Sequence, residues 1–166
     1  QFAEKSKIVV YKNVNIIKSE LEMLTELNEI MGKEIPIIPS YSEFEFGVII
    51  EGNHVVGLSL HWRKTTYIPE SIGWLTSLKE LSLGNNALTS LPDSISQLRS
   101  LEKLFLKSNK LTSLPDSFGQ LTSLKSLDIS YNMFTTFPES IGQLTALTYL
   151  DFIHNKGIVH RDIKPA

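Results

Sequence analysis

The chain contains no cysteine among its 166 residues. This absence excludes a disulfide framework, a zinc site built on thiolates and a cysteine nucleophile. Because disulfides persist mainly outside the reducing cytosol, their absence favours a cytoplasmic protein. The sequence also lacks the hydrophobic region of a signal peptide, although it begins at Gln1 rather than at methionine, which is compatible with removal of earlier residues.

Neither sign of charge is in large excess, because 16 basic residues nearly balance 18 acidic ones. We therefore expect no binding to nucleic acid and none to an anionic membrane. Long apolar runs are missing too, since stretches such as Phe46–Ile50 are far too short to span a bilayer. With 42% hydrophobic and 20% charged residues, the composition suits one folded domain, or one repeat array with a terminal cap.

What the sequence does contain is a repeat of 23 residues. Proline and asparagine each recur at this spacing, at Pro69, Pro92, Pro115 and Pro138 and at Asn86, Asn109, Asn132 and Asn155. Residues 91–109 and 114–132 share their leucine, proline and asparagine positions almost throughout. Such regular repetition predicts a solenoid, in which each repeat packs on its neighbours and no repeat forms a core alone.

Each recurring residue type has a physical role in such a repeat. Side chains alternate across a short strand at Leu104-Phe105-Leu106, so the two leucines point inward and Phe105 points outward. The asparagine after the strand is suited to bonding backbone groups where the chain turns, which predicts a ladder of side chains from Asn86 to Asn155. Proline begins the return segment, where its missing N–H removes a donor that needs a partner.

The pattern resembles the leucine-rich-repeat family, in the 23-residue intracellular class that reads LPxxIxxLxxLxxLxLxxNxL. The resemblance covers roughly Val55 to Asn155, and the class includes Ras-group repeats and the repeat regions of Roco proteins. It implies an α/β solenoid of about four to five repeats with a parallel β-sheet on a concave face. It also implies a scaffold or signalling module that binds a protein or peptide through that face, such as a small GTPase or a kinase-pathway component. We expect a monomer without a cofactor.

The repeats at 55–155 need a cap at each end, and residues 1–54 fit that role at the N-terminus. The residue pattern predicts a strand at Lys7–Tyr11 and a helix at Ile17–Met31, which Gly32 ends. Ser19 and Glu22 form a candidate capping box, which would start the helix later. A hairpin is expected from strands at 44–50 and 54–60. The alternative is that this region is a separate ligand-binding domain.

Residues 156–166 depart from the repeat and form either a tail or a makeshift C-terminal cap. The segment Gly157–Pro165 resembles the catalytic loop of protein kinases, with His160, Arg161, Asp162 and Lys164 at the matching positions. The resemblance implies that Asp162 would orient a substrate hydroxyl and Lys164 would contact the phosphoryl group. No Gly-rich loop or Asp-Phe-Gly accompanies the segment, so we expect it to be inactive. The alternative function is a non-catalytic regulatory or substrate-selecting fragment of a leucine-rich-repeat kinase.

Other residues that could carry chemistry fit structural roles better. His54, His61, His154 and His160 lack a carboxylate at a recognised metal-ligand spacing, so no metal site is expected. Asp128 and Asp151 occupy equivalent positions on neighbouring strands, where a solvated acidic patch is favoured over acid–base catalysis. No set of nucleophile, base and orienting group is evident. The chain is therefore not expected to be an enzyme.

Strand alternation predicts which side chains line the concave face. The candidate partner-binding residues are Trp62, Phe105, Lys107, Asp128, Tyr131, Tyr149, Asp151 and His154. Exposed aromatic side chains dominate interface hot spots, although aromatic residues also favour strands and pack across them. Five strands give a face only about 20 Å across, which suits a peptide, a loop or one side of a small domain. A purely structural spacer is the third alternative, and it predicts that these aromatic residues can be replaced without consequence.

Overall fold

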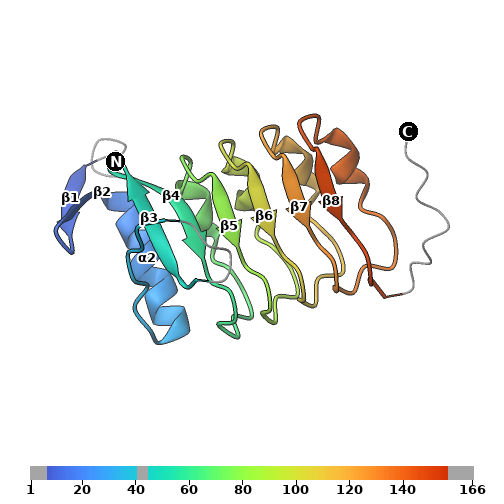
Figure 1. Ribbon diagram of the computed structural model, residues 1–166, viewed down its shortest axis with the longest axis horizontal. Helices are drawn as coiled ribbons and strands as arrows, with labels where there is room; N and C mark the ends of the chain where they lie inside the picture. Colours follow the sequence, from blue (N-terminus) through green and yellow to red (C-terminus); the bar gives the residue numbers. More distant parts are fainter. Residues whose placement is uncertain (1–6, 41–44, 157–166) are drawn as a thin grey trace.

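A computed structural model describes residues 7–40 and 45–156, whose strands form a two-stranded sheet and a six-stranded sheet (Figure 1). The main sheet has six strands in the order β3-β4-β5-β6-β7-β8. Its strands are β3 (Gly47–Glu51), β4 (His54–Ser59), β5 (Glu80–Ser82), β6 (Lys103–Phe105), β7 (Ser126–Asp128) and β8 (Tyr149–Asp151). Pairing is antiparallel between β3 and β4 and parallel from β4 to β8. The predicted solenoid with a parallel sheet is confirmed.

The register of the parallel strands follows the 23-residue period of the sequence. Leu58, Leu81, Leu104 and Leu127 are consecutive partners, and Leu127 pairs with Leu150. The first four of these leucines are fully buried. Because every repeat places the same residue in the same position, the leucines stack into one continuous apolar column.

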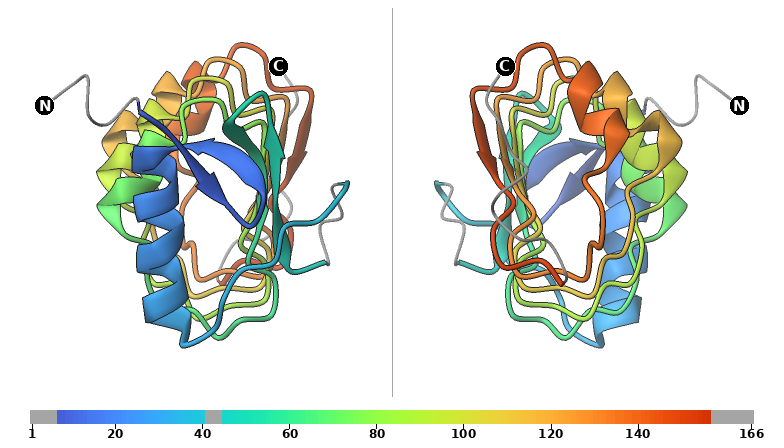
Figure 2. Two further views of the ribbon diagram at one scale, coloured as in Figure 1. Left: turned by 90° about the vertical axis from the view of Figure 1, so that its left-hand side faces the viewer. Right: turned by 90° about the vertical axis from the view of Figure 1, so that its right-hand side faces the viewer.

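Short 3-10 helices form the side of the coil opposite the sheet, as the end-on views of Figure 2 show. They are η1 (Glu70–Trp74), η2 (Asp93–Gln97), η3 (Asp116–Gln120) and η4 (Glu139–Gln143). The residue that precedes each helix is the recurring proline. Its position there fits the prediction, because proline has no N–H group that would need a partner at a helix start.

The asparagine ladder is present and begins where the sequence predicted. The Oδ1 atom of Asn109 accepts a hydrogen bond from the Leu88 N–H, and its Nδ2 donates to the carbonyls of Leu83 and Leu106. Asn132 makes the equivalent bonds, and Asn155 makes the equivalent donor bonds but accepts from the Asn132 N–H. Asn86 is the first member, because the preceding repeat has Arg63 at this position, and its partners there are all backbone groups, namely the N–H groups of Arg63 and Thr65 and the Leu60 carbonyl.

The N-terminal cap differs from the prediction at the start of its helix. Strand β1 (Ile8–Tyr11) pairs with an additional strand, β2 (Val14–Ile17), and helix α2 follows at once at Lys18–Met31. The predicted capping box of Ser19 and Glu22 is wrong, because Ile17 occupies the N-cap position and no side chain caps the helix. The chain enters the helix directly from a paired strand. Gly32 ends α2 in a left-handed conformation (φ 60°), as predicted.

The cap and the repeats share a single apolar core. Met23, Leu24 and Leu27 of α2 are buried in the same cluster as the leucines of the repeats. The predicted hairpin is confirmed, with a two-residue turn at Gly52 and Asn53, both left-handed (φ 55° and 72°). This geometry is that of the turn type that matches strand twist in tight hairpins. The second hairpin strand, β4, is also the first parallel strand, so the cap continues into the repeats without a break.

Candidate protein-binding surface

The sheet face is built from the side chains that alternate with the buried leucines. Its central row is Ser59, Ser82, Phe105, Asp128 and Asp151. Ser59 and Ser82 are fully buried, whereas the last three members are half-buried. The accessible part of the sheet face lies over β6, β7 and β8.

The residue before each ladder position forms a second row, just beyond the strand ends. Its members are Trp62, Asn85, Ser108, Tyr131 and His154, and all are left-handed, with φ between 53° and 58°. Strand alternation predicted Trp62, Tyr131 and His154 on the concave face, but strands β5 to β8 are only three residues long and these residues lie just beyond the strand ends. Asparagine tolerates this conformation, but for bulky residues such as Trp62 and Tyr131 it is a strained outlier.

Three side chains of the predicted surface contact one another at the C-terminal repeats. The rings of Tyr131 and His154 are stacked, with their centroids 4.4 Å apart and their planes at 12°. The Lys107 ammonium lies 5.3 Å from the centroid of the Tyr131 ring. Lys107 and His154 belong to the repeats on either side of Tyr131, so the tyrosine ring is held between them. The stack is exposed, and 45% of the Tyr131 surface is accessible.

At the N-terminal repeats, Trp62 stands beside a buried histidine. The His61 ring lies against Gly84, where an added Cβ atom would be 3.0 Å from His61 Nδ1. Burial lowers the pKa of His61, and the nearby positive charge of Arg63 lowers it further. The Trp62 ring meets the His61 ring edge-on at 6.0 Å and remains 67% exposed. Gly84 thus leaves room for His61, which in turn contacts Trp62.

The two aspartates of the predicted surface accept hydrogen bonds from backbone N–H groups. Asp128 and Asp151 are direct partners on β7 and β8. The Oδ1 atom of Asp128 accepts hydrogen bonds from the N–H and the hydroxyl of Ser130, and that of Asp151 accepts one from the Ile153 N–H. These bonds stabilise the turn after each strand. The carboxylates therefore have a structural task, which the sequence reasoning did not identify.

The flank of the sheet face, where the strands begin, carries ion pairs between repeats. Lys103 contacts Glu80 at 2.8 Å, and Lys125 contacts Glu102 at 2.9 Å. The Lys125 ammonium lowers the pKa of Glu102. All four side chains are partly or largely exposed, so each pair stabilises the fold only slightly. Tyr149 on the same flank is 54% exposed and completes the predicted aromatic set.

Outside the sheet face, the sequence offered two further groups of candidate residues, the histidines and the kinase-like segment. Within residues 7–40 and 45–156, no three His, Asp or Glu side chains are grouped as metal ligands would be. His54 instead contacts the buried carboxylate of Glu20 at 2.8 Å. The kinase-like residues His160, Arg161, Asp162 and Lys164 lie outside the described residues. No described helix is long and apolar enough to cross a membrane.

The chain is similar to known proteins both in its sequence and in its fold. A family profile described as "Leucine-rich repeat region" matches residues 25–162. The SOBIR1 receptor kinase ectodomain from Arabidopsis thaliana is 26% identical, with a TM-score of 0.61 over 84% of this chain and 94% of its own. A chain of the BIR3–SERK2 complex from the same organism is 27% identical, with a TM-score of 0.62 over 80% of this chain and 78% of its own.

A third solved structure is similar over a shorter stretch. A leucine-rich-repeat protein of Leptospira interrogans is 39% identical over 56% of this chain, with a TM-score of 0.44. The matched part spans only 30% of the length of that protein. No protein with curated annotation matches the chain.

Proposed function

Because the chain belongs to the leucine-rich-repeat family, we propose that it is an interaction module that binds a protein or peptide through its sheet face and the strand ends. The observation that most supports this proposal is the exposure of Trp62, Tyr131 and Tyr149, which are 67%, 45% and 54% accessible. Exposed rings contribute little to folding, and two of the three occupy strained left-handed positions. Aromatic side chains of this kind are the commonest anchors of protein interfaces.

The solved structures support a protein as the partner. One neighbour is a chain of the BIR3–SERK2 complex, in which two proteins are associated. The accessible part of the sheet itself covers only β6 to β8, and exposed residues at the strand ends, such as Trp62 and Tyr131, extend the surface. Neighbouring strands are about 4.8 Å apart, so this surface suits a peptide or a loop better than a large domain.

The resemblance to the intracellular repeat class supports two finer proposals. The partner is a small GTPase or a kinase-pathway component, and the compartment is the cytoplasm, which also fits the absence of cysteine. A second candidate function, a regulatory fragment of a kinase, is supported by the motif at Gly157–Pro165. Sequencing the transcript beyond Ala166 distinguishes the two, because a kinase would continue with an asparagine and an Asp-Phe-Gly motif.

The test compares two triple variants in affinity capture from the native lysate. The first replaces Trp62, Phe105 and Tyr131 with alanine on the sheet side. The matched control removes the same residue types on the segments that lead to and form the 3-10 helices. Its positions are Tyr67, Trp74 and Phe137, which are 53%, 36% and 43% exposed. Circular dichroism and thermal unfolding establish that both variants are folded.

The proposal predicts that the same proteins bind the parent and the control variant, and that they are lost from the sheet-side variant. Equal capture by all three proteins would contradict the sheet face as the binding surface and support a structural spacer. Loss of capture in the control variant alone would move the site to the helical side. Each retained partner is then confirmed with purified components, since capture alone does not establish direct contact.

A further inference from the structure

Acidic residues are missing from one edge of the repeats. We define the strand-end edge as residues 61–64, 84–87, 107–110, 130–133 and 153–156, which follow the five parallel strands. None of these residues is Asp or Glu. The edge contains five cationic residues, namely Arg63, Lys64, Lys107, Lys110 and Lys156. A chain with a net charge of −2 thus concentrates one sign of charge where its strands end.

The cations of this edge differ from the other cations of the repeats in their partners. Elsewhere Lys103 and Lys125 each contact a glutamate of the preceding repeat. In contrast, no ion pair within residues 7–40 and 45–156 involves Lys64, Lys110 or Lys156. Asp128 and Asp151, which lie two residues before the edge in their repeats, already accept backbone hydrogen bonds. The positive charge of the edge is therefore not neutralised by the described residues.

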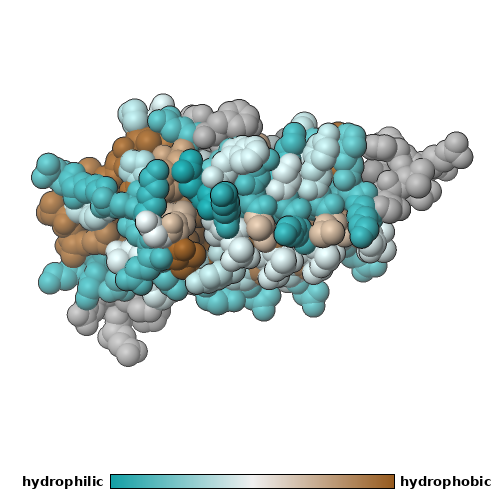
Figure 3. All heavy atoms as spheres, turned by 90° about the horizontal axis from the view of Figure 1, so that it is seen from below, coloured by the Kyte–Doolittle hydropathy of each residue, from teal (hydrophilic) through white to brown (hydrophobic). Residues whose placement is uncertain are grey.

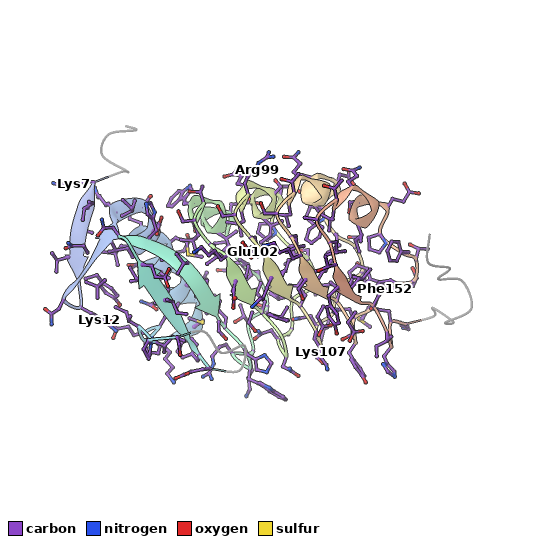
Figure 4. The ribbon with its side chains drawn as sticks, turned by 45° about the horizontal axis from the view of Figure 1, so that its top comes forward. Lys7, Lys12, Arg99, Glu102, Lys107 and Phe152 are labelled. Carbon is purple, nitrogen blue, oxygen red and sulfur yellow. The ribbon has the colours of Figure 1, made fainter. Side chains whose placement is uncertain are left out.

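The edge forms one accessible strip. Figure 3 views the molecule from the side where the strands end, and a mixture of hydrophilic and near-neutral side chains covers most of the repeats there, while apolar ones gather at the N-terminal cap. Figure 4 shows Lys107 at this edge and Arg99 on the opposite one. Since neighbouring strands lie about 4.8 Å apart, the strip is about 20 Å long, which equals about six residues of extended chain.

The aromatic residues of the strip help to distinguish between nucleic acid and an acidic peptide as its ligand. Single-stranded nucleic acid is usually bound by stacking bases on free aromatic faces. The Tyr131 ring is already stacked on His154 at 4.4 Å and covered by Lys107 at 5.3 Å. A base could reach it only by displacing one of them. Trp62, the other exposed ring, lies three repeats away. Carboxylates spaced along a peptide need only ammonium groups as partners. Their spacing suits an edge in which repeats with cations alternate with repeats without them, better than nucleic acid does.

We infer that the strand-end edge binds an extended acidic segment of a partner protein, about six residues long. The inference deepens the proposed function and rests on it. Carboxylates of the segment pair with Lys64, Lys107, Lys110 and Lys156, while Trp62 and the Tyr131–His154 stack contact the intervening side chains. The left-handed backbone at Trp62, Tyr131 and His154 holds their rings at the strip, away from the sheet.

The test uses fluorescence anisotropy with a labelled hexaglutamate peptide and its hexaglutamine counterpart. The edge variant is Lys107→Glu with Lys110→Glu. Its control, Lys103→Glu with Lys125→Glu, makes the same change of charge on the opposite flank. A second edge variant, Lys64→Glu with Lys156→Glu, leaves the Tyr131 stack intact and keeps the test valid if the first variant is poorly folded. All variants are checked by circular dichroism.

We expect the parent to bind hexaglutamate at least about tenfold more tightly than hexaglutamine, with an affinity that falls as salt is added. Either edge variant lowers the affinity about tenfold or more, and the control lowers it less than about threefold. Equal losses in the edge and control variants would overturn the inference. So would tighter binding of oligouridylate or of phosphatidylserine vesicles than of hexaglutamate.

Failure of this inference is distinguishable from failure of the proposed function. If the captured partners are lost with the aromatic triple variant but kept with both edge variants, the sheet face binds protein and the acidic-segment inference is wrong. If the partners are lost with both kinds of variant and the purified partner's acidic segment competes with hexaglutamate, both stand. If the aromatic triple variant keeps every partner, the proposed function is wrong as well.

Discussion

The side-chain nitrogen of Asn109 donates a hydrogen bond of 2.9 Å to the carbonyl oxygen of Leu83, one repeat earlier in the chain. The same nitrogen donates to Leu106 within its own repeat, and the Oδ1 atom accepts from the Leu88 N–H. All of these groups are buried. One amide side chain therefore satisfies backbone groups of two repeats, which explains why a short side chain with both a donor and an acceptor recurs there.

Replacing Asn109 with alanine is expected to lower the free energy of unfolding by about 1–3 kcal/mol, because it leaves the buried Leu88 N–H without its partner. The Leu83 carbonyl loses one of its two donors and keeps the Asn86 side chain. Lys110→Ala is the control, since that neighbouring side chain is exposed and should contribute less than about 0.5 kcal/mol. Urea denaturation monitored by circular dichroism measures both. Equal values for the two variants would show that the ladder bond adds nothing to stability.

Repetition made most of the fold predictable. A single strand such as Leu104-Phe105-Leu106 is too short to be recognised alone, but the leucine, proline and asparagine positions recur every 23 residues. Stacking then requires that position n pairs with position n + 23, and Leu81 does pair with Leu104. The direction of each side chain follows from strand alternation.

The sequence-based predictions fail where neighbouring residues determine the structure more than the 23-residue period does. Strand β2 ends at Ile17 and passes straight into α2, and no local sequence signal marks this boundary. The strand-end row was assigned by alternation, although the turn required by the ladder makes it left-handed. Asn85 was the residue in the sequence that could have indicated this left-handed turn, because asparagine is enriched in that conformation. The burial of Ser59 and His61 depends on tertiary packing, which a periodic pattern does not report.

The buried Glu20 of α2 is expected to anchor the cap to the repeats. It accepts hydrogen bonds from the Val55 N–H at 2.6 Å and from the His54 ring at 2.8 Å. Glu20→Ala should lower the free energy of unfolding by about 2–4 kcal/mol, because the buried Val55 N–H loses its partner. Glu22→Ala on the exposed face of α2 should cost about 0.5 kcal/mol or less, since its pair with Lys18 is 3.9 Å long.

Both glutamate variants are measured by urea denaturation, with hydrogen exchange at residues 54–59 as a second readout. Faster exchange in Glu20→Ala alone would locate the loss at the junction of α2 and β4. Identical denaturation midpoints for the two variants would contradict the anchoring role.

The stability of the protein should depend on the protonation of His61. Burial and the Arg63 charge hold its pKa below the ordinary value of 6.5, so the unfolded chain binds this proton at a higher pH than the folded chain does. The stabilisation is complete above pH 6.5 and is lost as the pH falls from there toward the folded pKa. In His61→Gln this contribution is absent.

The thermal midpoints of the parent and of His61→Gln are compared from neutral pH down to about pH 5. The stability advantage of the parent should shrink over this range, because every other titratable group is shared by the two proteins and cancels in the difference. A constant difference between the two midpoints would show that the pKa of His61 is the same in the folded and unfolded chains.

Two lysines at equivalent positions test the strain in the strand-end edge. Lys64 and Lys110 are both exposed and follow the ladder position of their repeats, but only Lys64 is left-handed, with φ 58°. Glycine adopts that conformation freely, and it removes a penalty of about 1–2 kcal/mol there. The same substitution also makes the unfolded chain more flexible, which costs about 0.4–1 kcal/mol at any position. The two effects oppose each other at Lys64, and only the second acts at Lys110.

Lys64→Gly is therefore expected to be as stable as the parent or up to about 1 kcal/mol more stable, whereas Lys110→Gly should be less stable by about 0.5–1 kcal/mol. Urea denaturation of both variants beside Lys64→Ala and Lys110→Ala separates backbone effects from loss of the lysine charge, because alanine removes the charge without relieving φ. If Lys64→Gly and Lys110→Gly lose the same stability, the left-handed position carries no strain. The strain argument for Trp62 and Tyr131 would then lose its basis, and their exposure alone would have to support a role in binding.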